Sequence, residues 1–427
     1  MLKGRKIQRK LRAGALYYVI FLLFLLTVLL TNYILFVHYK NILFVRQVGI
    51  SQLDSNIESA IELYQVNPEM VSDGSTASID IFKDNPSNVK VSSEFWGVYR
   101  LIRFETKYKE LSKTKIALFG NAYGSEKPFA LYMTDKNRYL SVCGNSVVSG
   151  RCYLPKLGFR TSRIEGILFS GTIEKRDDYI FESSAQIPSP PDFMINNSKK
   201  IIEAEYVGIN KQGDYLIGKK ELYNSFYDSL LVINAIDSIW KISNVSVSGK
   251  VVLHSYSIIE LESSLELQNV IVAARKIIVK KGFVGHAQLF ASDTIIVEED
   301  VKLDYPTNLC VVSMNPATIS IMLRANSQVT GVVWIWNELS NATYPPDLTI
   351  EHGATIRGQV YCPGKVLHKG VVIGSMIVDL FTLKTNYAYY ENYLFNATIN
   401  SEELPLNFAC MPFILKYPEM RFIDWVY

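Results

Sequence analysis

The sequence feature that most constrains this chain is a six-residue repeat that runs from Val247 to Leu303. Only 48% of the chain is apolar, so a long unbroken run of apolar residues at fixed positions is not expected by chance. A helix would need a period of about 3.6 residues. A period of six is typical of a short strand followed by a corner, and three such units form one coil of about 18 residues in a β-solenoid. Large apolar residues occupy these positions without exception: Val247, Leu253, Ile259, Leu265, Ile271, Ile277, Phe283, Leu289, Ile295 and Val301.

A comparison of the chain with itself, shifted by one coil, supports the same geometry. Residues 269–286 align on residues 287–304, with Ile271 over Leu289 and Ile277 over Ile295. Alternate side chains of a strand share one face, so the residues two positions after each large one are also predicted to point inward. An antiparallel sandwich, the main alternative, would alternate apolar and polar residues but would not keep one six-residue register.

A second motif, an apolar residue followed two positions later by glycine, brackets the first. Its glycines are Gly150, Gly166, Gly331, Gly358 and Gly374. A glycine at a corner permits backbone angles that other residues resist. The motif therefore predicts that the solenoid begins near residue 138, is interrupted from about 183 to 242 by a side module with a helix or hairpin, and then resumes.

The N-terminus predicts a membrane anchor. Six Lys or Arg residues lie within residues 1–12, and the run from Ala13 to Val37 carries no charge. That run is long enough to cross a bilayer and longer than the apolar part of a signal peptide, so we expect it to be retained. The positive-inside bias places the N-terminus in the cytoplasm and the main domain in the periplasmic or extracellular space. Helical spacing then continues through Leu53, Ile57, Ile61 and Tyr64 until Asn67-Pro68 ends the helix.

The predicted fold class is therefore mainly β: a three-sided β-helix preceded by a transmembrane and stalk helix and a small antiparallel sheet. The predicted divisions are a basic cytoplasmic segment (1–12), a transmembrane helix (13–37), a stalk helix (38–66), a small antiparallel β domain (67–135), a first part of the β-helix (136–182), an inserted module (183–243), a second part of the β-helix (244–400) and a C-terminal cap (401–427).

The sequence contains no pattern that assigns a catalytic, cofactor-binding or metal-binding residue, and no cofactor is expected. Its histidines stand alone, and no nucleophile, metal or nucleotide motif is present. His254 and His286 lie beside core positions and are predicted to point outward or to lie at corners. The net charge of +3 gives no indication of nucleic-acid binding. The histidines are His38, His254, His286, His352 and His368.

Three further groups of residues have a structural explanation and a functional one. The acidic run Glu298-Glu299-Asp300 could bind a cation, but Lys280-Lys281 precedes it by one coil, so the charges are expected to pair. The aromatic residues Trp334, Trp336, Tyr344 and Tyr361 suit either packing or a sugar-binding platform. Of the five cysteines, Cys143 and Cys152 are close enough in sequence for a disulfide, although Cys152 occupies an inward position and buried thiols are favoured.

Two parts of the chain resemble known families. The coil from Val247 to Leu303 resembles that of bactofilins, which are polymer-forming, non-enzymatic β-helix proteins, and also that of hexapeptide-repeat acyltransferases, in which a histidine between coils is catalytic. The segment RKLRAGALYYVIFLLFLL resembles the N-terminus of minor pilin-like proteins, with a step at Gly14-Ala15 where such chains are processed, although Val19 stands where those proteins usually have Glu.

The expected function is that of a non-enzymatic, membrane-anchored scaffold or surface-assembly protein of the cell envelope, for which the N-terminal resemblance implies a minor pilin-like component. Its expected partners are the membrane, through the N-terminal helix, and other proteins of an envelope assembly, with a glycan as a further possibility. The alternative is a β-helix enzyme, of the acyltransferase or polysaccharide-active type, or a carbohydrate-binding adhesin.

Overall fold

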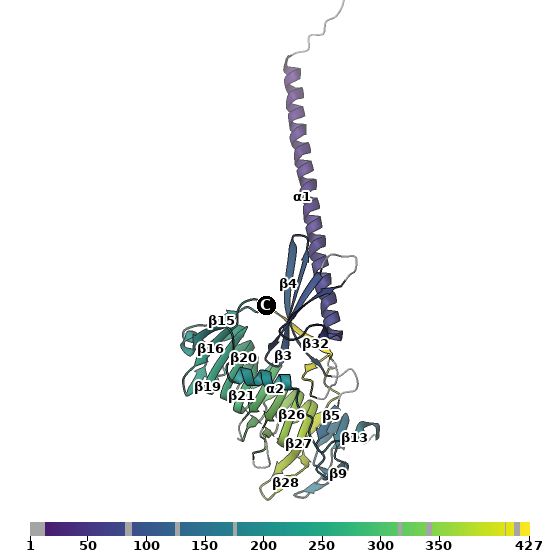
Figure 1. Ribbon diagram of the computed structural model, residues 1–427, viewed down its shortest axis with the longest axis vertical. Coiled ribbons are helices and arrows are strands. Elements are labelled where there is room, and N and C mark those ends of the chain that lie inside the picture. The colour runs from purple at the N-terminus through teal and green to yellow at the C-terminus, as the bar shows by residue number, and fades with distance from the viewer. Residues whose placement is uncertain are drawn as a thin grey trace, which may run out of the picture.

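The chain is mainly β, with one long N-terminal helix, a small antiparallel sheet and a large sheet of parallel strands (Figure 1). The computed structural model describes residues 13–81, 88–123, 129–173, 177–314, 318–338, 344–405, 407–413 and 419–427. The predicted basic segment 1–12 lies outside the described residues.

The helix α1 spans Ala13–Val66, a single element of 54 residues. Its apolar first part stands free of the rest of the protein, and its last part lies on the antiparallel sheet (Figure 1). The packing face contains Leu53, Ile57, Ala60 and Tyr64, all of which are buried. The predicted transmembrane and stalk segments are therefore one continuous helix, which ends before the 3-10 turn η1 (Pro68–Met70) because proline cannot donate the next backbone hydrogen bond.

The small sheet contains six strands in two separate regions of the sequence. The first four are β1 (Thr76–Asp80), β2 (Asn88–Trp96), β3 (Tyr99–Tyr108) and β4 (Leu111–Ala122), paired antiparallel in that order. Two C-terminal strands, β31 (Ala409–Cys410) and β32 (Met420–Val426), also pair with β4. Residues 401–427, predicted as a C-terminal cap, thus contribute two strands to the free edge of β4.

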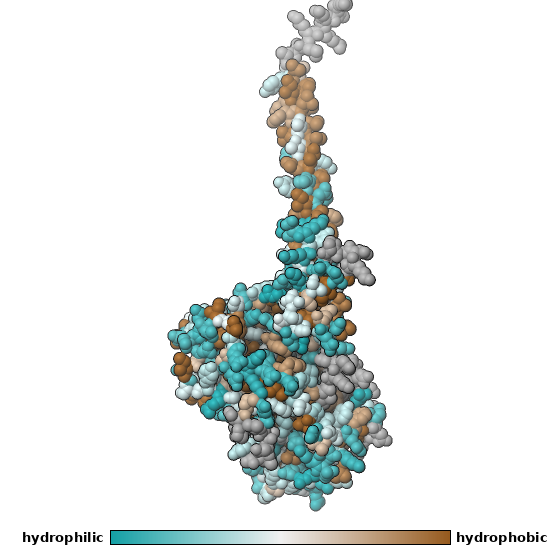
Figure 2. Space-filling view, viewed as in Figure 1, coloured by the Kyte–Doolittle hydropathy of each residue, from teal (hydrophilic) through white to brown (hydrophobic). Residues whose placement is uncertain are grey.

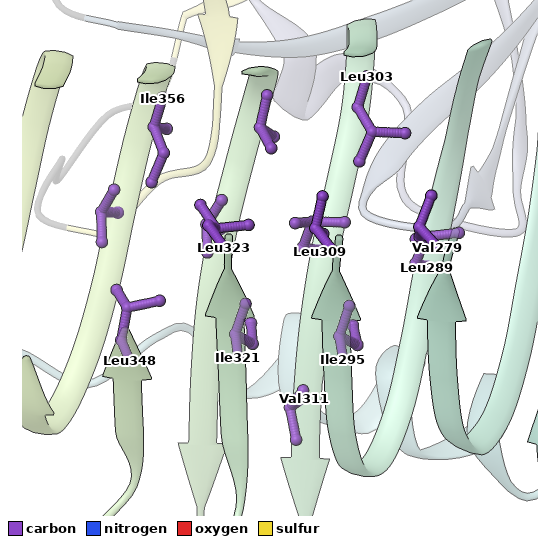
Figure 3. Packing of buried hydrophobic residues seen from close by; sticks show 14 of the residues in the cluster. Val279, Leu289, Ile295, Leu303, Leu309, Val311, Ile321, Leu323, Leu348 and Ile356 are labelled. Atoms are coloured by element: carbon purple, nitrogen blue, oxygen red, sulfur yellow. The ribbon is translucent and has the colours of Figure 1, made fainter. Parts of the chain in front are cut away.

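The large sheet joins 21 strands, almost all in parallel. Ile277 of one strand lies beside Ile295 of the next, which is the 18-residue shift expected from the sequence. Figure 3 shows how apolar side chains such as Leu289 and Leu309 from neighbouring strands lie side by side in the interior. The central strands are β16 (Leu231–Ala235), β17 (Ile239–Ile242), β18 (Ser246–Gly249), β19 (Val251–Leu261), β20 (Glu266–Val279), β21 (Val284–Val297), β22 (Lys302–Ser313), β23 (Ser320–Leu323), β24 (Gln328–Asn337), β25 (Asp347–Ile350), β26 (Thr355–His368) and β27 (Val371–Lys384).

The two ends of the large sheet do not follow the order of the sequence. The predicted first part of the β-helix lies at the end formed by β27, where Leu131 pairs with Met376 and Val147 pairs with Thr398. A repeated motif shows that strands stack but not at which edge, so the sequence did not predict this position. The strands at this end are β5 (Phe129–Met133), β7 (Val147–Ser149), β8 (Arg151–Leu154), β12 (Thr172–Ile173), β13 (Ile180–Glu182), β28 (Tyr389–Glu391) and β30 (Thr398–Asn400), beside a second small sheet of β6 (Leu140–Cys143), β9 (Phe159–Thr161) and β29 (Tyr393–Phe395).

The opposite end of the large sheet is built from the predicted inserted module, residues 183–243. Its strands β14 (Ile209–Gln212) and β15 (Glu221–Asn224) pair in parallel with β16 and β18. The stretch from Lys219 to Lys241, predicted as a helix or hairpin, instead contributes strands to the large sheet. The helix α2 (Asp192–Ile202) and the 3-10 turn η3 (Gly213–Leu216) lie outside the sheet, and α2 packs against β20, β21 and β22.

All ten residues of the six-residue repeat are buried, as predicted, but one of them faces outward. Nine belong to the interior cluster, whereas Ile271 belongs to the cluster on the outer face. Asn269 adopts a left-handed conformation at φ 59° and interrupts the register between Gln268 and Val270. Val272, not Ile271, therefore lies beside Leu289, which corrects the predicted alignment at this position.

Three of the repeated glycines form a column through the large sheet. Gly331 pairs with Gly358, and Gly358 pairs with Gly374. All three have φ between 141° and 149°, where side chains are disfavoured, and a Cβ on Gly358 would overlap the carbonyl oxygen of Gly331. Gly166 is different, because it lies in the open turn between β10 (Arg163–Ile164) and β11 (Ile167–Leu168).

Candidate functional site

His254 faces outward from the sheet interior, as predicted, but it is covered by α2. Its Nε2 atom lies 3.1 Å from the carbonyl oxygen of Ile202, and its Nδ1 atom has no partner among the described residues. Burial lowers the pKa of His254. A neutral ring that donates one hydrogen bond to a helix C-terminus positions that helix on the sheet, and the ring is not accessible to a substrate.

His368 is also buried and packs at the end of β26. Its Nε2 atom lies 3.1 Å from the carbonyl oxygen of Thr398, and burial lowers its pKa to about 4. His286 lies 3.2 Å from the side-chain oxygen of Asn269, the residue that interrupts the register. The ring nitrogens of these three histidines lie next to carbonyl or amide oxygens. Within the described parts of the chain, no group of three or more His, Cys, Asp or Glu residues is suited to hold a metal.

Of the four aromatic residues considered as a sugar platform, Trp334 and Tyr361 lie side by side on neighbouring strands, but both are buried. Trp334 and Tyr361 are fully buried beneath the C-terminal segment, where Phe413 stacks on Tyr361 with ring centroids 4.8 Å apart. Trp336 is half-buried and Tyr344 is exposed. These four side chains therefore form no continuous exposed surface, and packing explains Trp334 and Tyr361.

The charges on neighbouring strands pair as the sequence predicted. Lys280 Nζ lies 3.1 Å from a carboxylate oxygen of Glu298, and Lys281 Nζ lies 2.9 Å from Glu299. The carboxylate of Glu298 raises the pKa of Lys280, against a smaller effect of burial. Lys281 also lies 3.3 Å from Asp300, so two lysines pair with the three carboxylates of the acidic run.

All five cysteines are buried free thiols, so Cys143 and Cys152 form no disulfide. Burial raises the pKa of Cys362 and of Cys410 well above that of an exposed thiol. Thiols with raised pKa values are poor nucleophiles because little thiolate is present near neutral pH.

The small sheet is fixed to the large sheet by a polar contact that the sequence did not reveal. At the β2–β3 turn, the amide of Val98 donates to the Gln288 side-chain oxygen over 2.8 Å, and the Gln288 side-chain nitrogen donates to the Trp96 carbonyl over 2.8 Å. Trp96 Nε1 donates to the Asn269 carbonyl, and Asn197 of α2 donates to the Gly97 carbonyl. An alternating sequence pattern identifies Gln288 as outward-facing but not what covers it.

A cavity of about 520 Å³ lies beside this contact, between the β2–β3 turn, α2 and the first strands of the large sheet. Its charged lining residues are Glu94, Lys200, Glu205 and Lys250. Lys250 Nζ lies 2.8 Å from a carboxylate oxygen of Glu94, so these two charges compensate each other.

The largest unpartnered surface is the first part of α1. The most apolar 18 residues of this helix are all unburied, and Figure 2 shows the apolar side chains along the free part of the helix. By length and composition this helix can cross a membrane, and it is consistent with a single membrane span or a signal sequence. Among the described residues this helix is therefore the candidate functional site, a surface for lipid or for other apolar segments.

The fold and this site define a mainly β protein that has an exposed apolar helix at its N-terminus. Comparison with protein-family models, with curated proteins and with solved structures finds no match to the chain. The function is consequently argued from the structure and from the physical chemistry of its surfaces.

Proposed function

We propose that this protein is a membrane-anchored, non-enzymatic part of a cell-envelope assembly, with a minor pilin-like anchor and a rigid β-helical body. The observation that carries the proposal is the division of α1 into an exposed apolar half and a half packed on the small sheet. Large apolar side chains are exposed along residues 16–37, an arrangement that water disfavours and a bilayer stabilises.

The body is proposed to be a three-sided β-helix with coils of about 18 residues. The parallel pairing of Ile277 with Ile295, and of Gly331 with Gly358 and Gly374, supports this description. Such a stack contacts mainly its own neighbouring coils, which makes it a stiff rod with fixed rows of side chains. A rod held to a membrane helix through the small sheet suits assembly better than catalysis.

The orientation is tested with a cysteine introduced at Val207, which is 99% exposed on the body. The native cysteines are all buried, so the wild-type chain is the matched control and should not react. In intact spheroplasts, a membrane-impermeant maleimide should label Val207→Cys. Labelling only after lysis would contradict the proposed orientation, with the N-terminus in the cytoplasm and the body outside.

The assembly role is tested by affinity purification from membranes with the helix intact, beside a chain that lacks residues 13–37. Partners that co-purify with the intact chain and not with the shortened one support the proposal. Replacement of His254, His286, His352 or His368 by Gln, one at a time, should leave the cellular phenotype intact. If one of these histidine variants is folded and still shows the phenotype of the chain that lacks residues 13–37, the scaffold proposal is wrong. An acyltransferase-like function then takes its place.

A further inference from the structure

The apolar surface of α1 extends well beyond the predicted membrane span. After Lys40, the four consecutive residues Ile42, Leu43, Phe44 and Val45 are between 49% and 66% exposed. Four consecutive residues point in all directions around a helix, so no single packing face accounts for them. A helix that is apolar on all sides needs an apolar environment on all sides.

The β3–β4 turn reaches the same part of α1. A Cβ placed on Gly49 would lie 2.8 Å from Leu111 and 3.3 Å from the ring of Tyr108, so this glycine permits close packing of the turn on the helix. A cavity of about 420 Å³ lies between the two elements and is lined by Asn41, Ile42 and Val45 of α1 and by Tyr108, Lys109 and Leu111 of the turn.

Positive charges lie at this cavity: Arg46 and Lys109 belong to its lining, and Lys40 and Lys107 are each next in sequence to a lining residue. Lys40, Arg46, Lys107 and Lys109 have no carboxylate partner within 4.0 Å among the described residues, whereas the nearby Lys113 is paired with Asp54 at 2.6 Å. Lys109 Nζ instead lies 5.3 Å from the ring centroid of Tyr108. Glu110 is the one carboxylate of the turn, so the four cations and this anion leave the region positively charged.

The position of the turn along α1 fits the surface of a bilayer. Ile42 is five residues beyond Val37, which corresponds to about 8 Å along a helix. The headgroup layer on one side of a bilayer is roughly this thick. Tyr and Lys side chains with an apolar stem and a polar end are typical of this layer.

We propose that residues 41–46 of α1 and the β3–β4 turn form a second membrane contact, in which the cations and the apolar lining of the cavity bind anionic phospholipid headgroups. This inference rests on the proposed membrane anchor. The contact fixes the tilt of the body on the membrane, because it adds a second point of attachment beside the helix.

The test uses full-length protein in vesicles, with an environment-sensitive fluorophore on a cysteine at Glu110, and Val207→Cys as the matched distant control. Brominated phospholipids should quench the probe at residue 110 and leave the probe at residue 207 unchanged. The emission at residue 110 should shift to shorter wavelength when phosphatidylglycerol is added to phosphatidylcholine vesicles. The substitutions Lys107→Gln and Lys109→Gln together should abolish that shift.

Flotation of the same vesicles separates the two proposals. If the protein floats but the probe at residue 110 is quenched no more than the one at residue 207, the turn lies in water, the second contact is wrong, and another protein covers residues 42–45. If the protein does not float, the membrane anchor itself is wrong and the second contact falls with it.

Discussion

His368 is a residue whose titration is coupled to folding. Its folded pKa of about 4 lies below the ordinary value of 6.5 because the ring is buried, so the unfolded chain binds the proton more tightly. The stabilising effect of the neutral ring is fully present above pH 6.5 and is lost as the pH falls from 6.5 towards 4. At pH 5 the loss is on the order of 2 kcal/mol.

We predict that His368→Gln flattens the decline in stability between pH 6.5 and pH 4. Glutamine cannot take up the proton, so the variant loses stability at pH 7 but depends less on pH. Denaturant unfolding of both chains at several pH values measures the difference. The exposed His352→Gln is the control and should follow the wild type, and a parallel decline in the His368 variant would contradict the argument.

At the residue scale, the sequence predicted which face of a strand a side chain points to better than it predicted which segments cover that side chain. The six-residue period correctly placed Ile277 and Ile295 in the interior, because alternation follows from strand geometry alone. It misplaced Ile271, because the left-handed Asn269 inserts a local irregularity that no periodicity contains. It also did not predict that α2 covers His254, since contacts between distant segments leave no local pattern.

At the scale of elements, the glycine column predicts an unequal cost for two substitutions at positive φ. Gly358→Ala should destabilise the protein by about 3 kcal/mol or more, because the new methyl group meets the backbone of the neighbouring strand as well as an unfavourable φ. Gly218→Ala, at φ 76° in open space, should cost only about 1 kcal/mol. Chemical denaturation compares them, and equal costs would show that the column tolerates side chains.

The C-terminal segment predicts a second element-scale result. Phe413 is buried on Tyr361 and lies 6.3 Å from Trp334 between ring centroids, so Phe413→Ala should cost about 3–5 kcal/mol. The matched control Tyr387→Ala removes an aromatic ring that is 85% exposed and should cost little. Thermal unfolding distinguishes the two, and a small effect at Phe413 would show that the segment is dispensable.

Element types were more predictable than element order. The helix, the small sheet and the repeating strands each leave a local pattern of apolar residues. The pairing of β32 with β4, and of β5 with β27, depends on which strand edges remain free after the rest has assembled. That information belongs to the complete fold, so the sequence did not predict which strands residues 136–182 and 401–427 pair with.

At the scale of the whole molecule, the body should fold without the apolar half of α1. We predict that a chain beginning at residue 48 is soluble and unfolds at the same temperature as the full chain. A chain beginning at residue 66 lacks Leu53, Ile57, Ala60 and Tyr64, and burial of each large side chain contributes roughly 2–5 kcal/mol. Near-ultraviolet circular dichroism should show loss of fixed packing only in the shorter chain, and loss in both would show that the body needs its membrane segment.

The position of β5 and β7 at the end of the large sheet has a consequence for the time course of biosynthesis. β5 ends at Met133 and β7 at Ser149, yet their partners β27 and β30 begin only at Val371 and Thr398. Ribosomes add roughly 5–20 residues per second, so these edges wait about 12–50 seconds for their partners. During that interval β5 can pair with β8 and β7 with β12, but the edges that later join β27 and β30 stay open, and the safe passage of the nascent chain depends on whatever shields them from other chains.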